Sequence, residues 1–318
     1  MGRYVLTRLL QFLPTLFIAS VVVFLVIQAS PGDPARIKLG PEATPEQVAI
    51  ERTRLGLDEP LPVRYVIWLS DAVRLDLGRS FQSNLPVTDV VFDAFGYTVR
   101  LALAAGAIAT TLGISAGILA ALFRGRPLDI VISTMSAVLL SLPSFVIGIV
   151  LILVFAVNLR WLPSSGAGRT GQALLDGLRY LIMPAVALGL PFAAVLTRFM
   201  RAAMIEALGQ DHVLTARAKG LKPVTVVGRH AVRNALVPTI TIAGISLGTL
   251  LAGAVVIETV FSYPGLGRLI VGAIFNRDYP IVQAGLILAA VVLLGMSLLV
   301  DLMYGILDPR IRTGRSGS

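Results

Sequence analysis

The sequence predicts an all-α integral membrane protein with six transmembrane helices, because apolar residues dominate it and charged residues interrupt it at few places. Hydrophobic residues make up 56% of the 318 residues, charged residues make up 14%, and the mean hydropathy is +0.83. Soluble domains normally contain about 25% charged residues. This composition places the chain among membrane proteins and excludes an ordinary soluble domain.

Six stretches of the sequence contain no charged residue and are long enough to cross a bilayer. A hydrocarbon core of roughly 30 Å requires about 20 helical residues, and irregular chain leaves backbone groups unsatisfied in lipid. The stretches are Leu9 to Gly32, Leu101 to Phe123, Ile130 to Leu159, Tyr180 to Thr197, Asn234 to Ile257 and Tyr279 to Val300. Six spans place both termini on the same side of the membrane.

These stretches define the expected organisation of the chain. The first span lies within residues 1–29, and residues 30–97 form a long external connection. A transmembrane domain over 94–304 holds a cytoplasmic loop at 200–234 and five helices, at about 99–123, 130–158, 180–199, 235–257 and 280–301. Residues 305–318 form a cytoplasmic tail.

A cleaved secretory signal is the alternative for the first stretch, because Arg3 and Arg8 precede it and small residues follow it. Its apolar core runs from Leu9 to about Ile27, which exceeds the usual signal core of about 7–15 residues. We therefore expect an uncleaved anchor.

Basic residues favour one orientation of the six spans. They precede the first span, follow the second and the sixth, and are most frequent between the fourth and fifth, where they are Arg198, Arg201, Arg217, Lys219, Lys222, Arg229 and Arg233. By the positive-inside rule these connections and both termini are cytoplasmic. The arginines that oppose this bias are Arg160, Arg169, Arg179, Arg268 and Arg277. The basic residues behind the net charge of +9 are therefore distributed by membrane side, and the charge does not indicate binding to nucleic acid.

Several kinds of chemistry are excluded by the residues that are missing. The chain has no cysteine, hence no disulfide framework and no cysteine-ligated metal. Its two histidines, His212 and His230, both fall in the predicted cytoplasmic loop, which excludes a histidine-based site within the bilayer. No glycine is directly followed by lysine, so the phosphate-binding P-loop is absent. We expect no catalytic residue, cofactor or metal in this chain.

The long connection is expected to form a small external helical subdomain. Thr44 can cap a helix that has Pro45 at its first position and runs to about Arg54. A second helix follows Pro62 and carries an apolar face made by Val63, Val66, Ile67, Trp68, Leu69, Ala72 and Val73. This face suits the membrane surface or a partner, and a packed loop is the alternative.

Small residues and prolines mark places where the spans pack or bend. Gly113 with Gly117, and Gly244 with Gly248, are pairs four residues apart that allow close helix packing in lipid. Prolines inside spans three and four, Pro143, Pro184 and Pro191, bend the helices. Ser141, Pro143 and Ser144 are candidates for lining a translocation path, although serines can equally bond within their own helix.

The predicted cytoplasmic loop contains a short helix that needs a partner. Asp211 is expected to be its N-cap, His212 to Lys219 its body, and Gly220 its left-handed C-terminal residue. Leu214, Ala218 and Leu221 recur on one narrow apolar face of a segment that is too short to be stable alone. The helix therefore docks against something, and anionic lipid is the alternative to a protein.

Runs of residues along nearly the whole chain resemble the first of the two permeases, the B-type, of bacterial dipeptide and oligopeptide ABC importers. The cytoplasmic runs are Thr215-Ala216-Arg217-Ala218-Lys219-Gly220-Leu221 and Arg229-His230-Ala231-Val232-Arg233-Asn234-Ala235-Leu236-Val237-Pro238. The others are Pro31-Gly32-Asp33-Pro34, Leu55-Gly56-Leu57-Asp58, Asp76-Leu77-Gly78-Arg79-Ser80, Trp161-Leu162-Pro163, Glu258-Thr259-Val260-Phe261-Ser262-Tyr263-Pro264-Gly265-Leu266-Gly267, Arg277-Asp278-Tyr279-Pro280 and Asp308-Pro309-Arg310. The chain departs from the broader importer pattern because Leu214 stands where that pattern has glutamate.

The resemblance implies the type I ABC importer permease fold in a bacterial inner membrane. It further implies a second homologous permease, one or two P-loop ATPases that bind ATP and Mg, and an extracytoplasmic solute-binding protein as partners. The residues it assigns to ATPase coupling are Asp211, Leu214, Thr215, Ala216, Arg217, Ala218, Lys219, Gly220 and Leu221. ATP-driven closure of the ATPases would move this segment and tilt the spans.

Two questions stay open from the sequence. A self-contained secondary transporter or channel is the rival function, but it usually places ionisable residues at mid-membrane, whereas Glu258 and Asp301 lie at span ends. The solute is the second question, because the related importers carry dipeptides, longer peptides, nickel complexes, glutathione or oligosaccharides.

Overall fold

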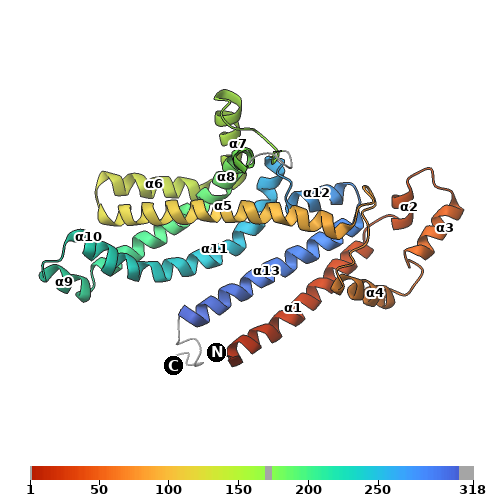
Figure 1. The fold of residues 1–318 in the computed structure, drawn as a ribbon, viewed down its shortest axis with the longest axis horizontal. Coiled ribbons are helices and arrows are strands. Elements are labelled where there is room, and N and C mark those ends of the chain that lie inside the picture. The colour runs from red at the N-terminus through yellow and green to blue at the C-terminus, as the bar shows by residue number, and fades with distance from the viewer. Residues whose placement is uncertain (1, 169–173, 308–318) are drawn as a thin grey trace. The chain divides into compact units, whose positions relative to one another are not determined.

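The chain is helical in a computed structural model that describes residues 2–168 and 174–307 (Figure 1). Within these ranges the only strand-like pairing is an isolated bridge between Arg79 and Pro86. The chain divides into two compact units. Unit 1 comprises Met1–Val5, Thr98–Tyr263 and Met296–Ser318, and unit 2 comprises Leu6–Tyr97 and Pro264–Gly295.

Among the described residues, four helices are long and apolar enough to cross a membrane without interruption. They are α1 (Gly2–Gln28), α5 (Val87–Leu122), α8 (Leu174–Leu208) and α13 (Tyr279–Leu307). Helix α5 begins about a dozen residues before the helix expected at 99–123, and α8 extends past the expected end at 199. Charge-free stretches underestimate helix length, because a helix continues beyond the hydrocarbon core and can carry charges there.

Two further spans are broken helix pairs. The first joins α6 (Pro127–Ser141) to α7 (Ser144–Leu151) and the π-helix η1 (Ile152–Asn158), with a bend of 104°. The second joins α10 (Pro223–Thr225), the π-helix η2 (Val226–Val232) and α11 (Arg233–Val260), with a bend of 51° between Gly244 and Gly248. If each pair is one span, the described residues supply six spans.

One predicted glycine pair brings helices of unit 1 into close contact. A Cβ atom at Gly113 would lie 2.6 Å from Cβ of Leu196, and one at Gly117 would lie 2.6 Å from Cβ of Met200. Helix α5 therefore approaches α8 closely at both positions, as small-residue pairs permit in lipid. This confirms the packing role predicted for the first pair.

The second glycine pair does not pack in the same way. A Cβ atom at Gly244 would have one neighbour, Val300 at 3.8 Å, and one at Gly248 would meet no described atom within 4 Å. Close packing at Gly244 and Gly248 is therefore not seen among the described residues, and for this pair it stays a prediction.

Glu258 lies at the end of α11 and is fully buried. Its Oε1 accepts a hydrogen bond of 2.6 Å from Oγ1 of Thr98 at the start of unit 1. A carboxylate in this position needs such partners, because an unpaired buried charge is costly. The position of Glu258 at a span end agrees with the sequence analysis.

Unit 2 contains the helices of the long connection. They are α2 (Pro34–Leu39), α3 (Pro45–Arg54) and α4 (Leu61–Val73). As predicted, Thr44 caps α3, with Pro45 at its first position. The Gln47 N–H donates to the Thr44 hydroxyl, and the Thr44 N–H donates in return to the side-chain oxygen of Gln47. Arg52 on α3 donates to Asp33 over 2.9 Å, and this bond raises the pKa of the Arg52 guanidinium above its ordinary value.

Unit 2 also contains α12 (Leu266–Phe275), a helix that the sequence reasoning missed. Its ten residues are too few to span a bilayer, and Arg268 interrupts the apolar run. Buried residues of α12, including Leu266 and Ala273, form one apolar cluster with Val87 and Val91 of α5 and with α13. Residues 264–295 therefore belong to the same compact unit as residues 6–97.

Candidate functional site

The predicted short helix of the cytoplasmic loop exists as α9 (Asp211–Ala218). Its N-cap is Gln210, which makes no side-chain capping bond, so the prediction that Asp211 caps the helix is wrong. Asp211 instead occupies the first turn, where its negative charge complements the positive end of the helix dipole.

The C-terminus of α9 has the predicted geometry. Gly220 has a φ of +74°, a conformation that glycine adopts at low cost. Its N–H donates to the carbonyl of Arg217 over 2.9 Å, and the Leu221 N–H donates to the carbonyl of Ala216 over 3.3 Å. These two bonds form a Schellman motif, which ends the helix and turns the chain sharply.

Helix α9 is held to its own chain by a face that was not predicted. Val213 and Ala216 are buried in a cluster with Val226 of η2, and Leu208 of α8 packs against them. Ala218 and Leu221, two members of the narrow apolar face that is expected to dock against a partner or lipid, are exposed. The side chain of the third, Leu214, lies outside the described side chains. Ala218 and Leu221 are therefore not covered by this chain, whereas Val213 and Ala216 are.

The exposed side of α9 is basic and small. The exposed, described members of the predicted coupling set are Asp211, Thr215, Arg217, Ala218, Lys219, Gly220 and Leu221, of which Asp211 is the acidic one. Ala216 belongs to the same predicted set, but it is buried and supports the helix instead. The arrangement presents cations and hydrogen-bonding groups from a short, anchored helix.

An ion pair that the sequence reasoning missed connects the helix before α9 to α6. Arg201 on α8 donates from Nε to Oδ1 of Asp129 over 2.6 Å and from a terminal nitrogen to Oδ2 over 2.8 Å. The Gly125 N–H and the Ser133 hydroxyl also donate to this carboxylate. Asp129 is only 4% exposed. Arg201 had been assigned to the loop as a positive-inside residue, and its partner lies 72 positions away.

The candidate path residues surround the break between α6 and α7. Leu142 and Pro143 have extended backbone conformations, and Pro143 precedes the first residue of α7, Ser144. Ser141 and Pro143 are exposed, and Ser144 is half-buried. The Ser141 hydroxyl donates to the carbonyl of Ala137 over 2.9 Å, so it bonds within its own helix. Non-helical backbone at membrane depth is tolerated where it lines a cavity or is buried in protein.

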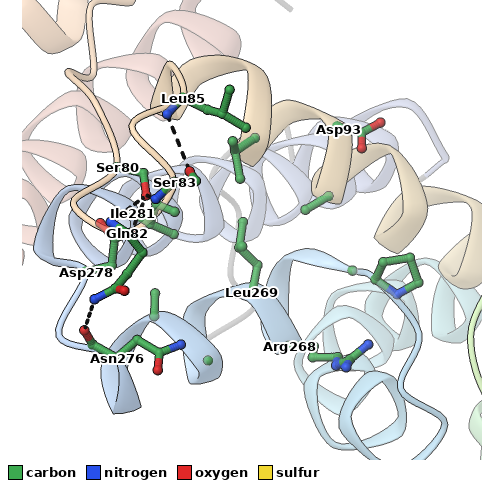
Figure 2. A pocket seen from close by; sticks show the side chains of 16 residues that line it. Ser80, Gln82, Ser83, Leu85, Asp93, Arg268, Leu269, Asn276, Asp278 and Ile281 are labelled. Atoms are coloured by element: carbon green, nitrogen blue, oxygen red, sulfur yellow. Dashed lines mark hydrogen bonds between the residues drawn. The ribbon is translucent and has the colours of Figure 1, made fainter.

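Unit 2 contains a pocket of about 560 Å³ between the start of α5 and α12 (Figure 2). Figure 2 shows Ser80, Gln82 and Asp278 grouped on one side of the pocket, apart from Asp93 and Arg268. Leu269 lies between these two groups, and Ile281 lies beside Gln82. Mixed apolar lining with a few polar groups, at this volume, is typical of small-molecule sites.

Asp278 shapes the wall of this pocket and joins two of the sequence runs. It is 2% exposed and accepts hydrogen bonds from the Ser80 hydroxyl and from the N–H groups of Phe81 and Gln82. The Gln82 side chain donates in turn to the carbonyl of Asn276 over 3.1 Å. The runs at 76–80 and 277–280 are far apart in sequence, but these hydrogen bonds hold them together in the structure.

Comparison with known families identifies the class of the chain. The family described as "Binding-protein-dependent transport system inner membrane component" matches residues 113–313. The family of the N-terminal part of binding-protein-dependent transport system membrane components matches residues 1–102.

Curated relatives match over almost their whole length. The probable peptide ABC transporter permease protein y4tP of Sinorhizobium fredii (strain NBRC 101917 / NGR234) is 42% identical over 312 residues, covering 98% of this chain and 100% of the relative. The glutathione transport system permease protein GsiC of Escherichia coli (strain K12) is 42% identical over 312 residues, covering 98% of this chain and 99% of GsiC.

Solved structures agree on the fold. A chain of the MetNI methionine ABC transporter, crystallised in inward-facing conformations, superposes with a TM-score of 0.56 at 18% identity and covers 70% of this chain and 98% of its own length. The fold is therefore that of type I ABC importer permeases. The chain belongs to the family of binding-protein-dependent transport system inner membrane components, as a multi-pass permease subunit of an ABC importer.

Proposed function

We propose that this permease carries short peptides, including peptides of the size of glutathione, across a bacterial inner membrane. The observation that carries the proposal is the 42% identity to a probable peptide permease and to a glutathione permease, each over nearly the whole chain. The likeness to the methionine transporter supports the fold alone, because the identity there is 18%.

The proposed complex contains a second homologous permease, one or two ATPases and a solute-binding protein. ATP and Mg bind to the ATPases, and this chain contributes half of the translocation path with both termini cytoplasmic. Ser141, Pro143 and Ser144 line that path at the break between α6 and α7. A break in a spanning helix supports this role, because transporters commonly build their paths from discontinuous helices.

The exposed face of α9 is the proposed contact with an ATPase. Val213 and Ala216 hold the helix to η2, while Arg217 and Lys219 face outward. Movement of α9 reaches α8 through Leu208, and the paired Arg201 and Asp129 carry it from α8 to α6. Such a partly buried bidentate pair is well suited to transmit a displacement, because two parallel hydrogen bonds fix the orientation of the guanidinium against the carboxylate.

The pocket of unit 2 supports a peptide as the solute. Asp93 offers a carboxylate that can pair with an ammonium group, and Arg268 offers a guanidinium that can pair with a carboxylate. A short peptide carries both of these groups at its ends. In the proposed orientation the pocket opens on the external side, where the solute-binding protein delivers its ligand.

Partner identity is tested by isolating the tagged, full-length chain from its native membrane in mild detergent. Co-isolation of a second six-span permease with P-loop ATPases is expected, and mass spectrometry identifies them. An Arg217→Glu variant is expected to lose the ATPases but keep the second permease, whereas Arg124→Glu, on another predicted cytoplasmic connection, is the matched control. Reproducible recovery of the intact chain alone would contradict the proposal.

The solute is tested in the purified complex reconstituted into liposomes with its binding protein. Uptake of radiolabelled dipeptides and tripeptides is expected, and an Asp93→Asn variant is expected to raise the KM for peptides with a free amino terminus. Asp89→Asn, one turn earlier on α5 and outside the pocket lining, serves as the control. Equal uptake by both variants would contradict the role of the pocket, and absence of peptide uptake in the unmodified complex would contradict the peptide itself.

A further inference from the structure

Helix α4 is fastened along one end of α1 by polar and aromatic contacts (Figure 1). The hydroxyls of Tyr65 and Ser20 are hydrogen-bonded over 2.7 Å. The ring centroids of Phe24 and Tyr65 are 5.3 Å apart, and those of Phe24 and Trp68 are 5.8 Å apart. These contacts lie within unit 2 and fix the position of α4 relative to the spanning segment of α1.

The contacts also fix the depth of α4. The spanning segment of α1 ends at Gln28, whose side chain accepts a hydrogen bond of 2.6 Å from Arg64. Ser20 lies eight residues earlier, which is about 12 Å along a helix axis at 1.5 Å per residue. Because Ser20 is inside the spanning segment, Tyr65 reaches below the end of the span toward the hydrocarbon core.

The opposite side of α4 is apolar and uncovered. Val63, Val66, Ile67 and Val73 are 43%, 63%, 51% and 77% exposed, and no residue within α4 is buried. Helix α1 exposes apolar side chains over the same stretch, with Leu25 49% and Val26 57% exposed. An apolar face at this depth continues a surface that is already suited to lipid.

We infer that α4 is an in-plane membrane helix, which lies at the boundary between headgroups and acyl chains of the leaflet at the Gln28 end of α1. Tyr65 and Trp68 are the aromatic residues favoured at this boundary. Arg64 and Arg74 lie toward the two ends of the helix, where a long cationic side chain can reach the headgroups. Lipid acyl chains therefore cover the exposed face of α4. This inference does not depend on which solute the importer carries.

The absence of cysteine makes this inference directly testable in the full chain. Single variants Val66→Cys, Ile67→Cys and Val73→Cys, each carrying a nitroxide label, are reconstituted into phosphatidylglycerol and phosphatidylethanolamine bilayers. Spin-label collision with oxygen and with a water-soluble nickel chelate then reports depth. Leu13→Cys on the exposed side of α1 is the lipid reference, and Glu59→Cys just before α4 is the water reference.

The α4 labels are expected to show an oxygen-to-nickel accessibility ratio several-fold above that of the Glu59 label and approaching that of the Leu13 label. Nickel accessibility equal to that of the Glu59 label would overturn the inference, because the face would then lie in water. Exclusion of both reagents with an immobilised spectrum would also overturn it, because protein would then cover the face.

Discussion

Helix α4 of unit 2 and helix α9 of unit 1 are both short helices, yet they expose opposite chemistry. Helix α4 exposes Val66 and Ile67, whereas α9 exposes Arg217 and Lys219. The contacts that hold the two helices to the rest of their units also differ. Tyr65 and Trp68 fasten α4 to a spanning helix with aromatic rings, and α9 rests on the small apolar cluster around Ala216.

The exposed face of each helix indicates the surroundings in which that helix is stable. An apolar outer face is stable only against lipid or an apolar protein surface, whereas a basic outer face is stable in water until a partner arrives. Both are α-helices, and their different lengths, 13 residues in α4 and 8 in α9, do not account for the contrast in exposed chemistry. What distinguishes the two helices is which face is buried and which side chains the other face exposes.

The largest effect is expected when α9 loses its support. Ala216→Asp places a carboxylate in the cluster formed with Val213 and Val226, which costs about 4 kcal/mol of local stability. Ala218→Asp makes the same substitution at an exposed position of the same helix and is expected to leave α9 folded. Limited proteolysis of the loop measures the difference, and equal cleavage of both variants would refute the anchoring role of Ala216.

The next largest effect concerns the pair between α8 and α6. Asp129→Asn leaves the Arg201 guanidinium without its carboxylate and is expected to lower stability by about 3 kcal/mol. The double variant Asp129→Asn with Arg201→Gln is expected to lose less than the sum of the single variants, because the two residues interact directly. Thermal unfolding in detergent gives these values, and additive losses would show that the pair is not coupled.

A smaller effect is expected at the end of α9. Gly220→Ala places a side chain in the left-handed region and is expected to cost about 1–2 kcal/mol, although open space surrounds the position. Asparagine tolerates this conformation better, so Gly220→Asn is expected to retain most ATPase association. ATPase recovery in the pull-down ranks the variants, and an asparagine variant weaker than the alanine variant would contradict a conformational role.

The smallest effect is expected at the anchor of α4. Tyr65→Phe keeps the aromatic contacts with Phe24 but removes the hydrogen bond to Ser20, which is expected to cost about 1 kcal/mol. Ser20→Ala is expected to give a similar loss, and the double variant little more. A loss in thermal stability as large as that of Asp129→Asn would contradict this ranking, because the hydrogen bond between α4 and α1 would then contribute as much as the ion pair between α8 and α6.

Much of the fold could be predicted from local signals. Thr44, Pro45 and Gln47 are neighbours in sequence, so the start of α3 follows from them directly. Gly220 ends α9 for the same kind of reason. The inward face of α9 could not be predicted, because it depends on where η2 places Val226, and a short helix with few apolar residues offers two equally plausible faces.

The sequence by itself determined the membrane class, the helical spans and, through several runs of family residues in order, the importer permease. Composition and charge spacing predict the membrane class and the spans, because the bilayer requires every span to be apolar and about 20 residues long. Only the tertiary structure decided which residues meet, because these pairs lie far apart in the chain. It brought Asp129 to Arg201, Asp278 to Ser80 and Tyr65 to Ser20, and it left the second glycine pair unpacked within the described chain.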